Sequence, residues 1–177
     1  ISNMDCQGVN NFTTRFVSDF KILNNLSIFN PNHNFDFNTH QVELGGNLTN
    51  YGIIDATNGT LFTNGPADQT FYNNTGPGIR IFNLRINKPT GNGNLLLAGI
   101  DNSNLIIKNT LDFTSINNAI IDASANNDAN AVIVSNSTGN EQILRNGSGH
   151  INSFHYRFFP VSAKTHIFPV GDNILTN

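Results

Sequence analysis

Five Asn-Leu pairs, each opening a short run that favours β-structure, constrain the fold of this chain more than any other feature. The pairs at Asn25 and Asn47 and those at Asn83 and Asn104 are separated by almost the same interval (47 − 25 = 22 and 104 − 83 = 21), with Asn94 at the half-step. Two or three short strands with their turns close one coil of a β-solenoid over such a length. The spacing therefore predicts stacked coils of about 21 to 22 residues.

The rest of the chain also favours strands. No window of a dozen residues keeps apolar positions at helical spacing without a Gly, a Pro or an Asn cluster. Short runs rich in β-formers, bounded mostly by Asn, Gly, Asp or Ser, take their place. The predicted strands are Phe16–Ile22, Leu26–Phe29, Gln41–Leu44, Tyr51–Ala56, Thr60–Thr63, Gln69–Tyr72, Gly78–Ile86, Asn94–Ile100, Asn104–Asn109, Thr110–Thr114, Asn118–Ala123, Asn130–Asn136, Glu141–Asn146, Phe154–Phe159 and Lys164–Val170.

Asparagine supplies about one residue in five, well above its usual share. Asn and Gly accept left-handed backbone at low cost, which suits the corners of a coil, and stacked Asn side chains can bond one another along the axis. We therefore predict an all-β fold, a parallel β-helix or β-solenoid. An antiparallel β-sandwich, which also uses many short strands, is the alternative.

A length of 177 residues is enough for one domain with a substantial core. We expect a single solenoid domain over 1–177, with an N-terminal cap or first coils at 1–41, repeat coils at 42–145, and C-terminal strands or a cap at 146–177. Because the chain opens on "ISNMDCQGVNNF" and stops after "FPVGDNILTN", we expect a piece of a longer protein that continues into a further module.

Charge and residue spacing exclude several classes of function. Only 12% of residues are charged and the net charge is -3, so neither nucleic acid nor an anionic membrane surface is an expected partner. No apolar run is long enough for a transmembrane helix. The single Cys6 cannot form an internal disulfide. We expect no metal and no cofactor. The histidines lack the spacing of metal ligands, and Asp122–Ala131 has no calcium-binding register and is predicted to be an ordinary loop. The histidines are His33, His40, His150, His155 and His166.

A β-helix can also carry polysaccharide lyase or glycoside hydrolase chemistry, which needs carboxylates gathered on one face, or a carboxylate-bound cation with a basic residue. The candidate acids are Asp55, Asp101, Asp112, Asp122 and Asp128, and the candidate cations are Arg80, Arg85 and Lys88. Alternation along strands predicts instead that these acids point outward beside buried aliphatic neighbours. We therefore expect no catalytic residues, with the enzyme as the alternative.

The strand Phe154–Phe159 is the predicted interaction surface. Alternation places His155, Arg157 and Phe159 on one face and Tyr156 with the other aromatic residues on the opposite face. A strand that caps the end of the solenoid is the competing interpretation. Nearer the middle of the chain, Pro89–Gly93 is predicted to be a corner, and Lys88 an exposed residue of the repeat.

Several motifs resemble the β-strand repeat region of large secreted cell-surface proteins of Bacteroidetes, which are exported by the type IX secretion system. The most specific are "FNLRINK" and "FPVG". The matching positions are Gly46, Asn47, Asn50, Gly52, Phe62, Gly65, Gln69, Phe82, Asn83, Leu84, Ile86, Asn87, Lys88, Gly91, Thr110, Leu111, Phe113 and Phe168 to Gly171. The bulky "HINSFHYRFFPVS" replaces the small-residue unit usual before the end.

The resemblance implies a secreted, surface-displayed structural or adhesin-like module without catalytic activity. Its implied partners are a glycan or a cell-surface protein, and type IX components during export. An accessory protein docked on a secretion or gliding machine is a further alternative, which predicts a large apolar patch near Phe154–Phe159.

Overall fold

The computed structural model describes residues 1–56, 58–74, 79–88, 93–99, 105–113, 120–122, 132–134, 142–145 and 150–152. Within these residues all regular structure is β-strand, arranged in two sheets. The seven-stranded sheet contains β1 (Met4–Cys6), β4 (Leu26–Ile28), β7 (Leu48–Asn50), β10 (Gln69–Asn73), β12 (Asn94–Gly99), β14 (Ile120–Asp122) and β17 (His150–Asn152).

The ten-stranded sheet consists of two tracks of stacked strands. The first track contains β2 (Phe12–Arg15), β5 (His33–Asp36), β8 (Ile53–Asp55), the start of β11 (Ile79–Ile86), the start of β13 (Leu105–Phe113) and β15 (Val132–Val134). The second track contains β3 (Phe20–Ile22), β6 (Gln41–Leu44), β9 (Thr60–Thr63), the ends of β11 and β13, and β16 (Gln142–Arg145).

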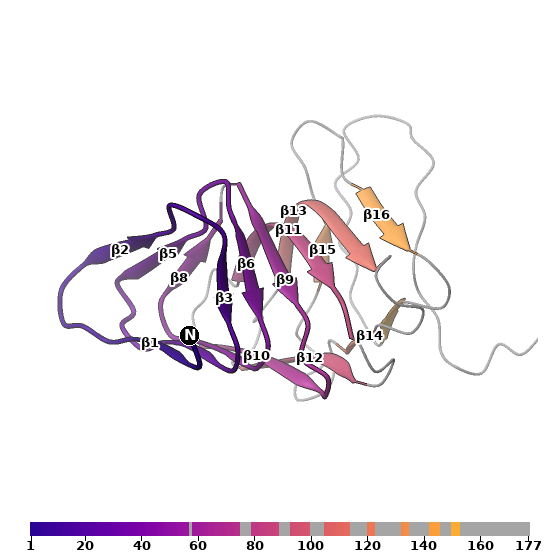
Figure 1. Ribbon diagram of the computed structural model, residues 1–177, viewed down its shortest axis with the longest axis horizontal. Coiled ribbons are helices and arrows are strands. Elements are labelled where there is room, and N and C mark those ends of the chain that lie inside the picture. The colour runs from indigo at the N-terminus through magenta and orange to yellow at the C-terminus, as the bar shows by residue number, and fades with distance from the viewer. Residues whose placement is uncertain are drawn as a thin grey trace, which may run out of the picture.

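The chain visits the seven-stranded sheet, the first track and the second track in turn, and then repeats. Each strand pairs in parallel with the equivalent strands of neighbouring coils, as Figure 1 shows for β3, β6 and β9. All pairings among the described strands are parallel. This confirms the predicted β-solenoid and excludes the antiparallel sandwich.

The coils lengthen along the chain. In the seven-stranded sheet Met4 pairs with Leu26, Leu26 with Leu48 and Leu48 with Phe71, which are steps of 22, 22 and 23 in residue number. Phe71 then pairs with Leu97, a step of 26. The predicted coil length therefore describes the first coils of this sheet, and the later coils are longer.

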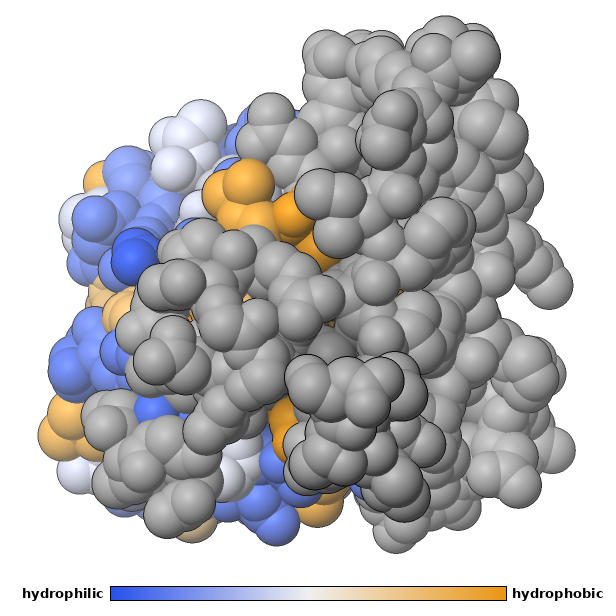
Figure 2. All heavy atoms as spheres, turned by 90° about the vertical axis from the view of Figure 1, so that its right-hand side faces the viewer, coloured by the Kyte–Doolittle hydropathy of each residue, from blue (hydrophilic) through white to orange (hydrophobic). Residues whose placement is uncertain are grey.

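The core is a continuous aliphatic and aromatic column inside the coils. Alternation turns every second residue inward, and stacking then places like residues above one another. Leu26, Leu48, Phe71 and Leu97 form one such column, each buried. On the face shown in Figure 2, most of the coloured surface is hydrophilic, and the hydrophobic side chains form small separate groups.

Left-handed corner residues join the first and second tracks. Asn38 has a φ of 55° and stands before β6, and Gly59 has a φ of 85° and stands before β9 in the next coil. A Cβ at Gly59 would come within 2.6 Å of the carbonyl oxygen of His40. The predicted use of Asn and Gly at corners is confirmed at these two positions.

Asparagine side chains bond successive coils at the start of the seven-stranded sheet. The Oδ1 atom of Asn3 accepts the backbone N–H of Asn25 at 3.1 Å, and the Oδ1 atom of Asn25 accepts that of Asn47 at 2.8 Å. Asn47 in turn accepts from Thr70 at 2.8 Å. The Asn-Leu pairs at Asn25 and Asn47 thus combine an axial bond with an inward leucine.

Other Asn-Leu pairs do not belong to this column. Asn83 lies within β11 of the ten-stranded sheet and pairs with Thr60 and Thr110. Asn94 begins β12 of the seven-stranded sheet, but its leucine, Leu95, pairs with Gln69 and so lies two residues before the column of Leu48 and Phe71. Leu105, which follows Asn104, pairs with Ile79 at the start of β11 rather than with Leu84. The interval between Asn83 and Asn104 is therefore not a coil period.

Most predicted strands in the described residues are present, but several strands were missed. The predicted run Phe16–Ile22 is wrong over its first half, because only Phe20–Ile22 is strand. The missed strands are β1, β2, β5, β7 and β17. The predicted strands Phe154–Phe159 and Lys164–Val170 lie outside the described residues.

Replacing Leu48 with alanine tests the stacked core. Leu48 is 1% exposed, so Leu48→Ala removes contacts on both sides of the column and leaves a cavity. We expect the free energy of unfolding, measured with urea, to fall by about 3 kcal/mol. Leu23→Ala is the matched control, since Leu23 is 53% exposed, and it should change stability by less than about 1 kcal/mol. Equal losses in the two variants would contradict this core.

Candidate functional site

The outer face of the second track carries a polar depression of about 350 Å³, which we call the axial groove. It crosses β6, β9, β11 and β13, one strand from each of four successive coils. Its lining residues are Gln41, Thr60, Asn83, Leu84, Arg85, Asn109, Thr110 and Asp112.

One wall of the groove is a row of amide and hydroxyl side chains. Strand register pairs Gln41 with Thr60, Thr60 with Asn83, and Asn83 with Thr110. The residue that follows each of them is a buried aliphatic one, so alternation turns the row outward. These four partly exposed side chains therefore recur once per coil along the solenoid axis.

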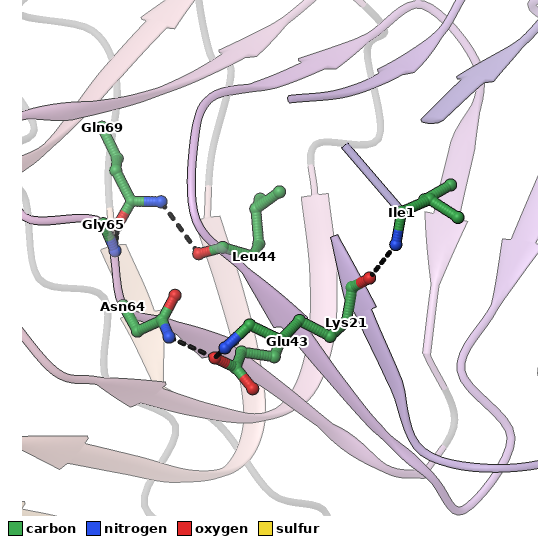
Figure 3. Close-up of polar contacts among 7 residues, drawn as sticks. All are labelled: Ile1, Lys21, Glu43, Leu44, Asn64, Gly65 and Gln69. Atoms are coloured by element: carbon green, nitrogen blue, oxygen red, sulfur yellow. Dashed lines mark hydrogen bonds and ion pairs between the residues drawn. The ribbon is translucent and has the colours of Figure 1, made fainter. Parts of the chain in front are cut away.

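A second row, two residues further along each strand, carries charge and an aromatic ring. It runs through Glu43, Phe62, Arg85 and Asp112. The guanidinium carbon of Arg85 lies 5.3 Å from the centroid of the Phe62 ring, and its Nε atom lies 3.5 Å from Oδ2 of Asp112. At the other end of the row, Figure 3 shows Lys21 and Asn64 both donating to Oε1 of Glu43.

Hydrogen bonds fix the amides of the first row. The Nδ2 atom of Asn109 donates to Oδ1 of Asn83 at 2.8 Å, and Nδ2 of Asn83 donates to Thr60 Oγ1 at 3.4 Å. Each bond links two neighbouring coils, because the donor and acceptor lie on adjacent strands. The wall of the groove is thus held in place by the same stacking that forms the sheet.

The structure distributes the predicted catalytic acids over different tracks. Asp55 ends β8 in the first track, Asp112 lies on β13 in the second, and Asp122 ends β14 in the seven-stranded sheet. Asp101 and Asp128 lie outside the described residues. Of the predicted catalytic acids whose position is described, only Asp112 lines the groove, where it lies beside Arg85. The candidate cation Arg80 does not line the groove, and its strand position pairs in register with Asp55.

Lys88 is fully buried, so the prediction that it is an exposed residue of the repeat is wrong. Its Nζ atom donates to Oε1 of Gln69 at 2.5 Å and to the carbonyl of Ala67 at 3.1 Å. Burial lowers the pKa of Lys88 to about 8, and the nearby carboxylate of Asp68 opposes that shift. Polar partners inside the fold allow a lysine at this position.

Gln69 forms the centre of this buried corner. Its Nε2 atom donates to the carbonyls of Leu44 and Gly46 at 3.1 and 2.6 Å, and its Oε1 atom accepts the N–H of Gly65 at 3.0 Å. Figure 3 shows Gln69 between Gly65 and Leu44. Together with the bond from Lys88, these contacts make the Gln69 amide a link between residues of three successive coils.

The histidines do not form a site where the structure describes them. His33 is buried, its Nε2 atom lies 2.9 Å from Thr14 Oγ1, and burial lowers its pKa. His40 lies 3.6 Å from Asp19. Across the described residues, no group of three or more His, Cys, Asp or Glu side chains could hold a metal ion. The predicted interaction residues His155, Tyr156, Arg157 and Phe159 lie outside those residues.

Comparisons with known proteins return no match: no protein-family model, curated protein or solved structure matches this chain. Nor does the described part of the chain contain a helix long and apolar enough to cross a membrane. The groove and the buried corner are therefore interpreted from their own geometry.

Sequence reasoning missed the first row of the groove, although a signal for it exists. Each member is a polar residue directly before an inward aliphatic one, as in Gln41-Val42, Thr60-Leu61 and Asn83-Leu84. The intervals between these pairs are unequal, because the first two stand closer together in the sequence than the last two, so a search for a fixed period does not find them. A search for polar-aliphatic pairs with a variable interval includes the row, but it also returns Asn25-Leu26 and Asn47-Leu48 of the seven-stranded sheet.

Lys88 should make the stability of the fold depend on alkaline pH. Between about pH 8 and the ordinary lysine pKa of about 10.4, the unfolded chain holds a proton that the folded chain has released. Stability rises with pH when the unfolded state binds more protons, so Lys88 should add about 3 kcal/mol to the free energy of unfolding across this window.

The measurement is urea unfolding of the wild type and of Lys88→Met between pH 7 and 10.5. Because burial raises the pKa of Cys6 to about 11, that thiol titrates in the opposite sense in both proteins. The informative quantity is therefore the difference between the two proteins at each pH. A difference that stays constant across the range would contradict the buried charge.

Proposed function

We propose that this chain is a non-catalytic, surface-displayed structural or adhesin-like module of a larger secreted bacterial protein. The observation that carries the proposal is the repetitive stacking of short coils, each bonded mainly to its neighbours by parallel strands and side-chain ladders. Repeat architectures of this kind form long, continuous surfaces and hold their two ends apart, rather than enclosing a reaction chamber.

Contacts between coils support a mechanical role. Arg15 bonds Asp36 at 2.8 Å, Lys21 bonds Glu43, and the amide of Asn50 donates to that of Asn73 at 2.7 Å, each pair joining adjacent coils. Opening one coil would break backbone pairing, core packing and these bonds together. A rod with such coupling resists local unfolding, which benefits a protein exposed to proteases outside the cell.

The proposed location and partners rest on the sequence resemblance to Bacteroidetes surface repeats. On this proposal the chain is displayed at the cell surface, passes through the type IX secretion route, and meets glycans or cell-surface proteins there. The alternative of a component docked on a secretion or gliding machine depends on Phe154–Phe159, which lies outside the described residues.

One observation favours the alternative of a carbohydrate-active β-helix. Asp112 and Arg85 line the same groove with their charged groups 3.5 Å apart. Most glycoside hydrolases use a pair of carboxylates about 5 to 10 Å apart, whereas Asp112 is the single carboxylate among the described groove residues. A passive binding surface needs no such pair, so we prefer the non-catalytic function.

Surface display can be tested with antibodies raised against this chain. On intact cells that carry the gene, we expect antibody labelling without permeabilisation, because a module that spaces or binds outside the cell must be accessible there. An antibody against a cytoplasmic protein is the control, and it should label only permeabilised cells. Labelling of the chain only after permeabilisation would refute the proposal, and labelling that persists when type IX export is disabled would refute that route alone.

A further inference from the structure

We propose that the axial groove binds a neutral, linear polysaccharide lying along the solenoid axis. The inference builds on the proposed function, since it gives a ligand class to a surface-displayed module. It rests on three properties of the groove: its hydrogen-bonding chemistry, its repeat distance and the absence of an open strand edge in its floor.

The first row matches the chemistry of sugar hydroxyls. Each hydroxyl of a glycan both donates and accepts, and so do the amides of Gln41 and Asn83 and the hydroxyls of Thr60 and Thr110. The Asn83 amide can form four hydrogen bonds, and its contacts with Asn109 and Thr60 account for two of them among the described residues. A polyol placed against the row can use the remaining donors and acceptors.

The spacing of the row suits a chain rather than a single sugar. Neighbouring strands lie about 4.8 Å apart, so equivalent polar groups recur at that interval along the axis. This distance is close to the advance of one pyranose unit in an extended glycan. The four coils that line the groove can therefore bind successive sugar units with equivalent side chains.

Other ligand classes fit the groove less well. A peptide that adds to a sheet needs an unpaired edge, but β9 and β11 at the centre of the groove are paired on both sides. A polyanion needs a cationic surface, but the charge of Arg85 is balanced by Asp112 at 3.5 Å. The near-neutral, amide-rich wall favours an uncharged glycan.

Affinity gel electrophoresis tests the proposal with the whole chain and defined probes. The gels contain xyloglucan, mixed-linkage β-glucan, glucomannan or, as an anionic probe, polygalacturonate. We expect at least one neutral polymer to retard the chain. The double variant Gln41→Ala and Thr110→Val removes polar groups from both ends of the row. It also removes the 3.1 Å bond from Asn109 Nδ2 to Thr110 Oγ1, but it keeps the bonds from Asn109 to Asn83 and from Asn83 to Thr60. We expect it to weaken retardation about tenfold or more.

Thr49→Val is the matched control, because Thr49 is a partly exposed threonine on β7 of the other sheet. It should bind as the wild type does, and thermal melts should show all variants folded. Retardation by none of the neutral polymers, binding to polygalacturonate alone, or equal binding by the double variant would each overturn the proposal. Release of reducing ends from a bound polymer would overturn passive binding in favour of an enzyme.

Surface labelling of intact cells does not depend on the binding results, so the proposed function and the proposed glycan site can fail separately.

Discussion

Strand register between successive coils is the constraint on which the rest of this structure depends. A shift of one residue in any strand would turn its inward side chains to solvent, so the strands must keep their alignment while the chain between them varies. Leu95 pairs with Ile121 and Ile121 with Ile151, although the second step along the chain is longer than the first. Inside a strand, β13 contributes one more residue than β11 at the irregularity between Ile81 and Asn83, and the pairing returns to register after it. The inward residues thereby stay aligned while the length of the coils changes.

The same register arranges the polar residues outside the core. Once Leu26 lies beneath Leu48, the asparagines that precede them are also stacked, and each accepts a backbone N–H from the next coil. On the second track, alignment of the inward residues likewise places Thr60 beside Asn83 and forms the wall of the axial groove. Core packing, axial hydrogen bonds and a potential binding surface thus have one geometric origin.

The fold class was predictable because inward aliphatic residues and corner-forming Asn and Gly are local signals. The coil length was predicted only for the first coils, since the Asn-Leu pairs that suggested it lie on different tracks. Strand β5 was missed because His33 occupies an inward position, where an aliphatic residue was expected, and is accommodated by Thr14 and the Phe12 ring, 3.8 Å from its own. Such partners come from another coil, and a sequence does not show which residues will be stacked together.

Lys88 shows how a change in strand length creates a polar core. β10 is two residues longer than β7, so Gln69 occupies an inward position without an equivalent strand residue in the coil before it. The carbonyls of Leu44 and Gly46 face that position. With a leucine there, the Leu44 carbonyl would keep the backbone N–H of Asn64 at 3.1 Å, but the Gly46 carbonyl would lose the donor that Gln69 supplies. The Oε1 atom of Gln69 accepts two hydrogen bonds, one from the backbone N–H of Gly65 and one from the Lys88 ammonium. From Gln69 onward the position is aliphatic, as Leu95 and Ile121. The buried ammonium therefore accompanies the longer strand: Gln69 bonds the carbonyls of Leu44 and Gly46 in the coil before it, and Lys88 bonds Gln69 and the carbonyl of Ala67.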